Sequence, residues 1–453
     1  MTELEDYAGR LEALAQRLGL EHYAVDFELA PASLMTEIAV YGLPIRMPHW
    51  SYGVRYIHQL VRQSMGHSKI FEVMFPGDPC RAFLMDSNSL AENTLVAAHV
   101  LGHADFSRNN QLFARFHAMA GGNIVEHAAA HAQRIQQAIE AAGLERVEAV
   151  LDAALALESH VDVSGELRRP PYPEFVPEKT APTETAFQQR FGQLPGAAEK
   201  ASPSAGPPLR TRIPPHAEYD LLWFIAHYAP ELEQWERDIF LMVRAESLYF
   251  YPVFACQIMN EGWASYWHAR LLREADFLPQ PLYLSAIKAH SDVVRPFASG
   301  EQTALAVNPY HLGFTLWEHI VDKQGLERAR EVMRDEDDFG FIRNCLDRDL
   351  AEKAGLFVYE ARPGGELRVA SRDLEAIREA ILAPKYNYGA PRVAATELKS
   401  DGTLVLTHEH ASDGRGLDAA RAKKVLEYTR RAWRRAVRLH TVNERGEPVE
   451  LVS

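Results

Sequence analysis

The chain has 453 residues, of which 47% are hydrophobic and 24% are charged, a composition typical of a globular protein with a substantial core. Its formal charge of −14 at neutral pH disfavours a general nucleic-acid or anionic-membrane binder, because phosphate-rich partners are attracted to basic surfaces. The three cysteines, Cys80, Cys256 and Cys345, form no CxxC pair and no dense framework, which fits a reducing cytosol.

The N-terminal segment carries acidic residues where a secretory signal has a basic stretch followed by an apolar one. We therefore expect no export signal and a cytoplasmic location. The longest apolar runs, such as 221–226, are far shorter than the roughly 20 residues that span a bilayer, so no membrane span is expected. Apolar residues at helical spacing predict an amphipathic helix over about 3–20: Leu4, Tyr7, Leu11, Leu14 and Leu18.

Most of the following chain has helical periodicity. Ser89-Leu90-Ala91-Glu92 is a capping box that begins a helix, and further helices are predicted over 123–142 and 145–157. Between about 164 and 216 the composition shifts to Pro, Ala, Ser and charge, which predicts a linker or long surface loop. Three consecutive helices are predicted over 219–272, broken near Pro230 and Pro252. Later helices are predicted at 281–293, 301–306, 311–322, 325–335 and 343–354.

Beyond Leu356 the pattern changes to short apolar pieces. They lie at 357–359, 367–369, 393–398 and 404–408, and Gly364-Gly365 and Asp401-Gly402 are the expected hairpin turns. A helix at about 416–432 and further pieces at 436–441 and 448–452 complete a small α+β domain. We predict a mainly α protein with four regions: helical 1–163, linker or loop 164–216, helical 217–356 packing with the first region as one body, and α+β 357–453.

Two histidines one helical turn apart are the first candidate for chemistry. His99 and His103 project from the same helix face, so both imidazoles can bind one cation, as in the His-Glu-x-x-His helix of zincins. Hydrolytic zincins carry a general-base glutamate after the first histidine, and Val100 stands there and cannot accept a proton. Gly102 leaves room for a close neighbour beside the metal.

The distant segment Asn260-Glu261-Gly262-Trp263-Ala264 supplies a third candidate ligand, Glu261, because some zincins present their glutamate ligand in a similar Glu-Gly-Trp-Ala context. His268 lies on the same helical face at i+7, where it would be a fourth ligand, a residue supporting a ligand, or an acid. The nitrogen and oxygen donors favour Zn²⁺, with Mn²⁺ and Fe²⁺ also compatible. The competing interpretation is that the tryptophans are core residues and Glu261 pairs with an arginine.

Several other groups are weaker candidates. Glu92 and Asp105 lie on the His99 helix and are candidate bases, although Glu92 also serves the capping box and Asp105 can instead orient an imidazole. Tyr310 and His311 follow Pro309 at a predicted helix start, where they would stabilise an oxyanion or form an aromatic N-terminal staple. A second metal site at His408, His410 and Asp413 is disfavoured, because strand alternation would put His408 and His410 on one exposed face.

Along most of its length the sequence resembles the stage V sporulation protein R (SpoVR) family. The matching stretches are 98–106 with Asn109-Asn110, 131–135, 160–162, 259–268, 308–313 and 342–344. The family name implies a role in building the spore cortex, a peptidoglycan layer, although similar proteins are widespread in bacteria that do not sporulate. The resemblance also implies partners, a serine kinase and a von Willebrand-type protein linked to stress and stationary phase. Val100 belongs to the family pattern.

We therefore expect a zincin-like helical body that binds a divalent metal through His99, His103 and Glu261, with His268 nearby. If the protein is an enzyme, the expected chemistry is hydrolysis or transfer at an amide bond in a peptidoglycan precursor or a protein. The competing hypothesis is a regulatory or scaffold protein that keeps the metal fold and binds partners such as the kinase. The sequence does not specify the substrate or the oligomeric state.

Overall fold

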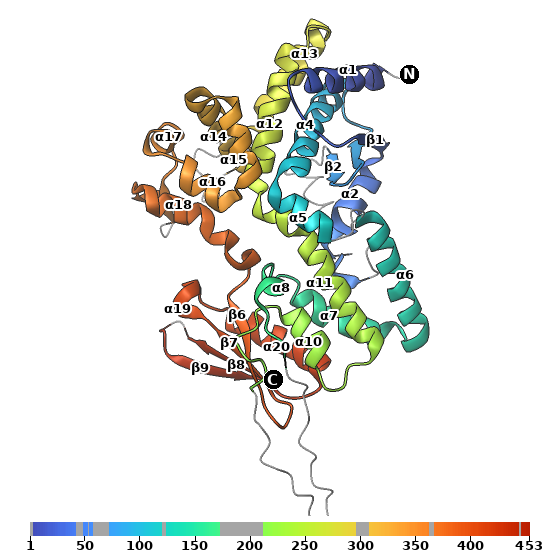
Figure 1. The fold of residues 1–453 in the computed structure, drawn as a ribbon, viewed down its shortest axis with the longest axis vertical. Coiled ribbons are helices and arrows are strands. Elements are labelled where there is room, and N and C mark those ends of the chain that lie inside the picture. The colour runs from blue at the N-terminus through green and yellow to red at the C-terminus, as the bar shows by residue number, and fades with distance from the viewer. Residues whose placement is uncertain are drawn as a thin grey trace, which may run out of the picture. The chain divides into compact units, whose positions relative to one another are not determined.

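The computed structural model describes residues 3–41, 49–52, 54–57, 72–119, 124–172, 212–295, 308–361, 367–443 and 445–453. The described chain is mainly α with small sheets and a C-terminal α+β portion, as the sequence predicts (Figure 1). It divides into two compact units, each made from two separate stretches of sequence. The first contains Met1–Glu148 and Arg244–Gly389, and the second contains Ala149–Val243 and Ala390–Ser453.

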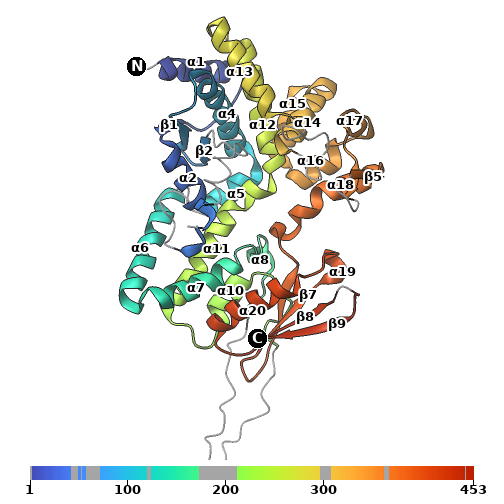
Figure 2. The same cartoon turned by 180° about the vertical axis from the view of Figure 1, so that it is seen from behind.

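A three-stranded sheet near the N-terminus of the first unit was not predicted. After α1 (Glu3–Arg17), the chain forms β1 (Val25–Ala30), α2 (Ala32–Tyr41), β2 (Glu72–Phe75) and β3 (Cys80–Met85), labelled in part in Figure 2. The strand order is β1-β3-β2, with β1 parallel and β2 antiparallel to β3. These strands have only four to six residues each, and short strands leave little periodicity to detect in a sequence.

The central helix of the first unit is α4 (Leu90–Asn109). It begins at the predicted capping box, in which Ser89 Oγ accepts from Glu92 N and the Glu92 carboxylate accepts from Ser89 N at 2.7 Å. The fifteen consecutive residues from Asn93 to Ser107 are all buried, so this part of α4 is enclosed on all sides. The predicted helices that follow are confirmed as α6 (Ile124–Ala142) and α7 (Leu144–Ala156), after the shorter α5 (Gln111–Met119).

The three helices predicted over 219–272 are confirmed as α10 (Leu221–Tyr228), α11 (Gln234–Ala255) and α12 (Gln257–Glu274). The second break is at Cys256 rather than Pro252, which lies inside α11. Cys256 N donates to Pro252 O at 2.9 Å, so the turn after the proline stays closed, and the axes of α11 and α12 then differ by 58°. No single described helix meets the length and apolarity of a membrane span; the bent pair α11 and α12 meets them only jointly.

The remaining helices of the first unit are α13 (Gln280–Val293), α14 (Pro309–Gln324), α15 (Leu326–Asp335), α16 (Asp338–Cys345), α17 (Arg348–Lys353) and α18 (Leu374–Leu382). The strands β4 (Val358–Ala361) and β5 (Leu367–Ser371) pair antiparallel as predicted and belong to the same unit. The helix predicted at 301–306 and the turn at Gly364-Gly365 lie outside the described residues, as does most of the predicted loop at 164–216.

Close helix crossings explain the glycines of the sequence motifs. The helix α12 packs most extensively on α4 and α14. A Cβ atom on Gly262 of α12 would lie 2.3 Å from the carbonyl carbon of Gly313 on α14, and one on Gly102 of α4 would lie 2.7 Å from Cα of Ala264. Backbones therefore touch at both crossings, which fixes α12 between the other two helices. Gly102 was expected to leave room for a close neighbour, and in the structure that neighbour is helix α12.

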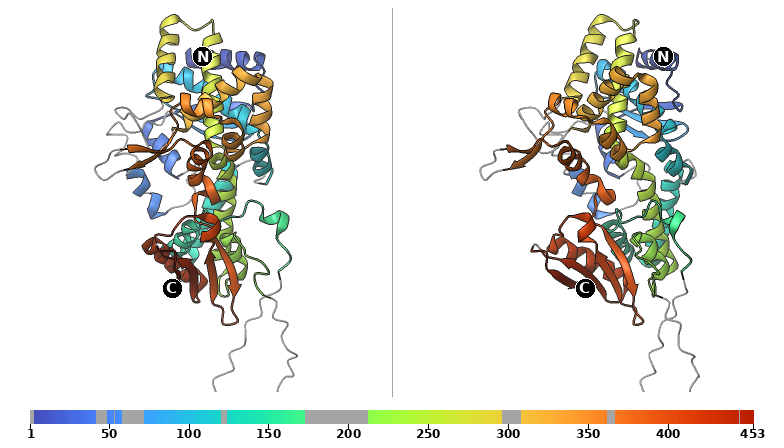
Figure 3. Two further views of the ribbon diagram at one scale, coloured as in Figure 1. Left: turned by 90° about the vertical axis from the view of Figure 1, so that its left-hand side faces the viewer. Right: turned by 60° about the vertical axis from the view of Figure 1, so that its left-hand side comes forward.

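The second unit combines helices with one sheet. Its helices include α8 (Gly165–Arg168), α10, α19 (His410–Asp413) and α20 (Ala419–Trp433). Its strands, red in Figure 3, are β6 (Val393–Leu398), β7 (Leu404–His408), β8 (Val437–Val442) and β9 (Pro448–Val452), in the order β6-β7-β8-β9. The pairs β6/β7 and β8/β9 are antiparallel and β7/β8 is parallel. Trp433 of α20 stacks on Phe224 of α10, with ring centroids 6.0 Å apart.

Candidate metal centre

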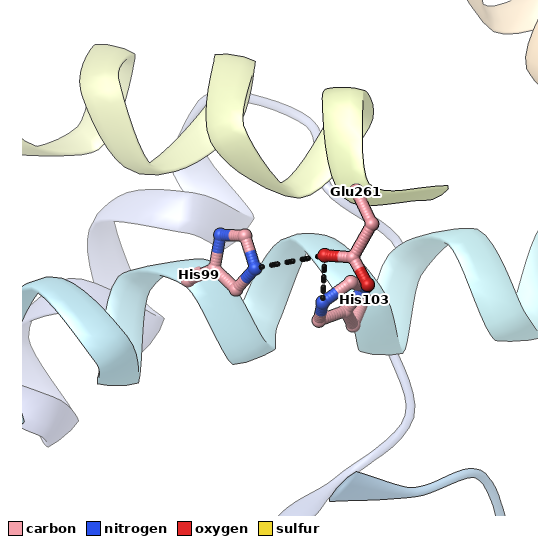
Figure 4. A group of neighbouring side chains, drawn as sticks. All are labelled: His99, His103 and Glu261. Atoms are coloured by element: carbon pink, nitrogen blue, oxygen red, sulfur yellow. Dashed lines mark ion pairs between the residues drawn. The ribbon is translucent and has the colours of Figure 1, made fainter. Parts of the chain in front are cut away.

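Three predicted ligands from two helices converge in the first unit. His99 and His103 of α4 point toward Glu261 of α12 (Figure 4). Glu261 Oε2 lies 3.6 Å from His99 Nε2 and 3.5 Å from His103 Nε2. One ligand atom from each residue lies within 4.8 Å of the other two, which is the spacing of a group that can hold a metal ion. His103 and Glu261 are 158 positions apart in the sequence, and the packing of α4 on α12 brings them together.

Two of the three ligand atoms of this group are buried and lack hydrogen bonds. Among the described residues, neither His99 Nε2 nor Glu261 Oε2 has a hydrogen-bond partner. A buried polar atom without a partner costs about 1–3 kcal/mol, so such atoms are rare unless a ligand satisfies them. The chemistry of the set, two imidazole nitrogens and one carboxylate, fits Zn²⁺. The residues present therefore fit a bound divalent cation.

The outer nitrogens of both imidazoles are held by neighbouring side chains. His103 Nδ1 donates to Asn260 Oδ1 at 2.9 Å, and His99 Nδ1 lies 2.9 Å from His268 Nδ1. His268 Nε2 in turn lies 2.6 Å from His290 Nδ1 on α13. These contacts fix each ring so that its Nε2 atom faces Glu261. His268 uses both of its ring nitrogens in this network, so it supports His99 and does not belong to the group around Glu261.

The electrostatics of the group favour a charged carboxylate. Burial raises the pKa of Glu261, but the two nearby imidazoles outweigh that effect and hold the pKa below its usual range. Burial lowers the pKa of His103, and the Glu261 carboxylate more than offsets this, so the pKa is raised. Burial, followed by the nearby His99 and His290, holds the pKa of His268 well below its usual value. His268 is therefore a neutral hydrogen-bonding group at neutral pH.

A cleft of about 320 Å³ opens beside His99. Its lining includes His99, His268 and Tyr310, together with the apolar side chains of Leu95, Val96, Ala289 and Val293. The ring of Tyr310 lies nearly parallel to that of His99, with centroids 6.2 Å apart. The negative charge of Glu261, then burial, raises the pKa of Tyr310 well above its usual value, so its hydroxyl remains a hydrogen-bond donor. The predicted Tyr310 is thus beside the group.

Sequence reasoning missed Glu72, the first residue of β2. Its Oε1 atom lies 4.0 Å from His99 Nε2, and its side chain also lines the cleft. Burial raises the pKa of Glu72, the nearby His99 lowers it and Glu261 raises it again, leaving it above the usual value. No sequence signal pointed to this residue, because its strand was not predicted. Asn260 and His290 were also missed, although Asn260 directly precedes Glu261 in the quoted motif.

Two of the predicted site residues lie elsewhere. Asp105 accepts from Trp263 Nε1 at 2.8 Å and from Glu21 N at 2.8 Å, so it anchors α4 to α12 and to the chain after α1. His311 Nδ1 faces the Val294 carbonyl at 3.1 Å, and its side chain is not part of the cleft lining. Glu92 does line the cleft, but the capping box holds its carboxylate.

The expected exposed histidine pair at 408 and 410 is wrong. The strand β7 ends at His408 and α19 begins at His410, so the two residues do not alternate along one strand. His408 is buried, with Nδ1 2.9 Å from Thr441 Oγ1 and Nε2 3.5 Å from Asp413 Oδ2. The geometry makes His408 a core residue of the second unit.

A buried carboxylate fixes the start of α12, four residues before Glu261. Asp338 is fully buried and accepts from Ile258 N and Met259 N, both at 2.9 Å. Lys385 Nζ lies 2.9 Å from the same carboxylate and also donates to Phe254 O at 2.7 Å. Negative charge at a helix N-terminus is stabilising, so this pair holds the ligand-bearing helix in place.

The chain belongs to the SpoVR family: the family model described as "SpoVR like protein" matches residues 1–390. A relative from Escherichia coli (strain K12), named "Uncharacterized protein YcgB", is 28% identical over 483 residues, covering 99% of this chain and 93% of that protein. No solved structure matches the chain. The predicted resemblance to the family is thereby confirmed, and the family match includes all the residues of the candidate metal centre.

Proposed function

We propose that this SpoVR-family chain is a metalloprotein that binds one divalent cation through His99, His103 and Glu261. The observation that carries the proposal is the pair of buried atoms, His99 Nε2 and Glu261 Oε2, that face one another without hydrogen bonds. Two histidines one turn apart and a glutamate from a second helix form the kind of ligand set found in zincins. Zn²⁺ is the leading candidate, with Mn²⁺ and Fe²⁺ compatible with the same donors.

We further propose that the centre acts on an amide bond, by hydrolysis or transfer. A divalent cation would supply Lewis acidity, which polarises a carbonyl group or activates water. The chain's own contribution is the cleft: its apolar wall of Leu95, Val96, Ala289 and Val293 orients an apolar group and excludes water. Tyr310, kept protonated, would donate a hydrogen bond to an oxygen that gains negative charge.

The cellular setting of this proposal follows from the family. We propose a cytoplasmic protein linked to spore cortex formation or to stress responses, with a peptidoglycan precursor or a protein as substrate. The family resemblance also supplies candidate partners, a serine kinase and a von Willebrand-type protein. A cytoplasmic location makes a precursor a better candidate than the mature wall.

The second candidate function is a scaffold in which the metal only stabilises the fold. The observation that favours it is Val100, which is fully buried in the core and leaves α4 without a base at the usual position. The cleft beside His99 favours catalysis, because a structural metal site has no need of an open approach.

Metal content tests the first part of the proposal, that the chain binds a divalent cation. The protein is purified, reconstituted separately with Zn²⁺, Mn²⁺ and Fe²⁺, and measured by elemental mass spectrometry beside the His99→Ala/His103→Ala variant. His127→Ala is the matched control, because His127 is an exposed histidine on α6. We expect about one metal per wild-type and control chain and none in the double variant. Absence of metal from the reconstituted wild type would refute the proposed function.

A further inference from the structure

We propose that Glu72 is the general base of the centre, supplying from strand β2 the carboxylate that α4 lacks at Val100. This inference rests on the proposed metal-dependent function. It concerns a residue that lies 27 positions before His99 and on a different kind of element.

The position of Glu72 relative to the ligand group carries the assignment. Glu261 contacts both imidazoles at 3.6 and 3.5 Å, as a ligand shared by one cation would. Glu72 pairs with His99 at 4.0 Å and is not in the group of three, among the described residues, whose ligand atoms lie within 4.8 Å of one another. Its side chain lines the cleft, whereas His103 and Glu261 do not. Glu72 therefore lies beside the ligands on the side where a substrate would enter.

The other carboxylate of the cleft is unsuited to this role. Glu92 also lines it, but its Oε2 accepts from Ser89 N at 2.7 Å and from Ser89 Oγ at 3.0 Å. Taking up a proton there would break the capping box that begins α4. Glu72, in contrast, is placed by backbone pairing of its strand, in which it lies opposite Leu84 of β3. Its carboxylate is therefore positioned by the sheet without being engaged in a helix cap.

The step assigned to Glu72 is a proton transfer in amide hydrolysis. Its carboxylate takes a proton from water while the water oxygen forms a bond to the amide carbonyl carbon, and Tyr310 donates a hydrogen bond to the carbonyl oxygen. Glu72 then gives the proton to the amide nitrogen as the C–N bond breaks. One amide and one water become a carboxylic acid and an amine, and Glu72 returns to the carboxylate.

Acetohydroxamic acid provides a test that needs no knowledge of the substrate. This ligand chelates a metal with its two oxygens and gives up its O–H proton, which a neighbouring base accepts and holds in a charge-assisted hydrogen bond. Metal-loaded wild type, Glu72→Gln and Glu92→Gln are compared by elemental analysis and then by calorimetric titration with acetohydroxamic acid. The Glu92→Gln change is a matched control, because glutamine also completes a capping box.

We expect all three proteins to hold the same amount of metal. Glu72→Gln should weaken hydroxamate binding about tenfold or more, and Glu92→Gln should change it less than about twofold. Glu72→Asp, which retains a carboxylate on a shorter side chain, should give an intermediate affinity and guards against misinterpreting a folding defect in the glutamine variant.

Four outcomes would overturn the assignment, and they separate it from the proposed function. Loss of metal from Glu72→Gln with the fold retained would make Glu72 a ligand. An unchanged hydroxamate affinity in Glu72→Gln would exclude Glu72 as the base. If the wild-type protein held metal but did not bind hydroxamate, the metal would have no open position beside which Glu72 could act as a base. Wild type without metal, detected before any hydroxamate is added, would remove the proposed function itself.

Discussion

The Nδ1 atoms of His99 and His268 lie 2.9 Å apart, so His268 meets the side of the His99 ring that points away from Glu261. We expect His268→Ala to lower metal affinity about tenfold, because loss of an outer partner that orients a ligand typically costs 10–100-fold. Competition with a chromogenic chelator measures the effect. Complete loss of metal, equal to that of His99→Ala, would instead identify His268 as a ligand.

Asp105 is expected to affect stability and not metal binding. In Asp105→Ala, Trp263 Nε1 and Glu21 N lose their acceptor; Trp263 is fully buried, and its unsatisfied donor costs about 1–3 kcal/mol, whereas Glu21 is exposed. Urea unfolding of the metal-free protein should show this loss in the free energy of unfolding, while metal stoichiometry stays at the wild-type value. A variant with wild-type stability and no bound metal would show instead that Asp105 takes part in metal binding.

The crossing of α12 and α14 should not tolerate a side chain at Gly262. A Cβ atom there would lie 2.3 Å from a backbone atom of Gly313, so Gly262→Ala must push the helices apart, at a cost of about 3 kcal/mol or more. Gly9→Ala on α1 is the matched control, because nothing lies within 4 Å of the added atom. The control should stabilise the protein by about 0.5–1 kcal/mol through helix propensity. If the two changes shifted the thermal unfolding temperature equally, the close backbone approach of α12 and α14 at Gly262 would be contradicted.

A double-mutant cycle tests the ion pair that fixes the start of α12. Asp338→Ala leaves Lys385 buried without its carboxylate and should cost about 3–5 kcal/mol of unfolding free energy. Lys385→Met in the Asp338→Ala background removes the stranded charge, so the double variant should be more stable than Asp338→Ala alone. Additive destabilisation in chemical denaturation would show that the two residues do not act as a pair.

His160 in the second unit should make stability depend on pH. Burial lowers the pKa of His160 from 6.5 to about 4, so between these values the unfolded chain binds a proton that the folded chain does not. Its contribution is fully present above about pH 6.5 and is lost as the pH falls toward 4, with a slope below about 1.4 kcal/mol per pH unit because the folded and unfolded states differ by less than one bound proton. His160→Gln should flatten this part of the urea-derived stability profile, and His127→Gln, at an exposed position, should not. A wild-type slope retained in His160→Gln would assign it to other groups.

Local patterns in the sequence were sufficient for most of the helices. The Ser89 and Glu92 capping box marked the start of α4 correctly, because both halves of that interaction lie within one helical turn. The pairing of His99 with His103 was also local, since a helix brings residues four apart to the same face. Glu261 was identified by its motif context, and the fold placed it beside the two histidines as expected.

The tertiary structure alone decided which distant groups meet the helix face that carries His99 and His103. Glu72 reaches His99 only because β2 pairs with β3, and His290 reaches His268 only because α13 packs on α12. The contacts of Asp105 show the same dependence: its position after His103 is visible in the sequence, but its partner Trp263 lies 158 residues away. Short-range periodicity specifies helices and shared faces, whereas contacts between elements depend on packing across the whole unit, which no window of sequence contains.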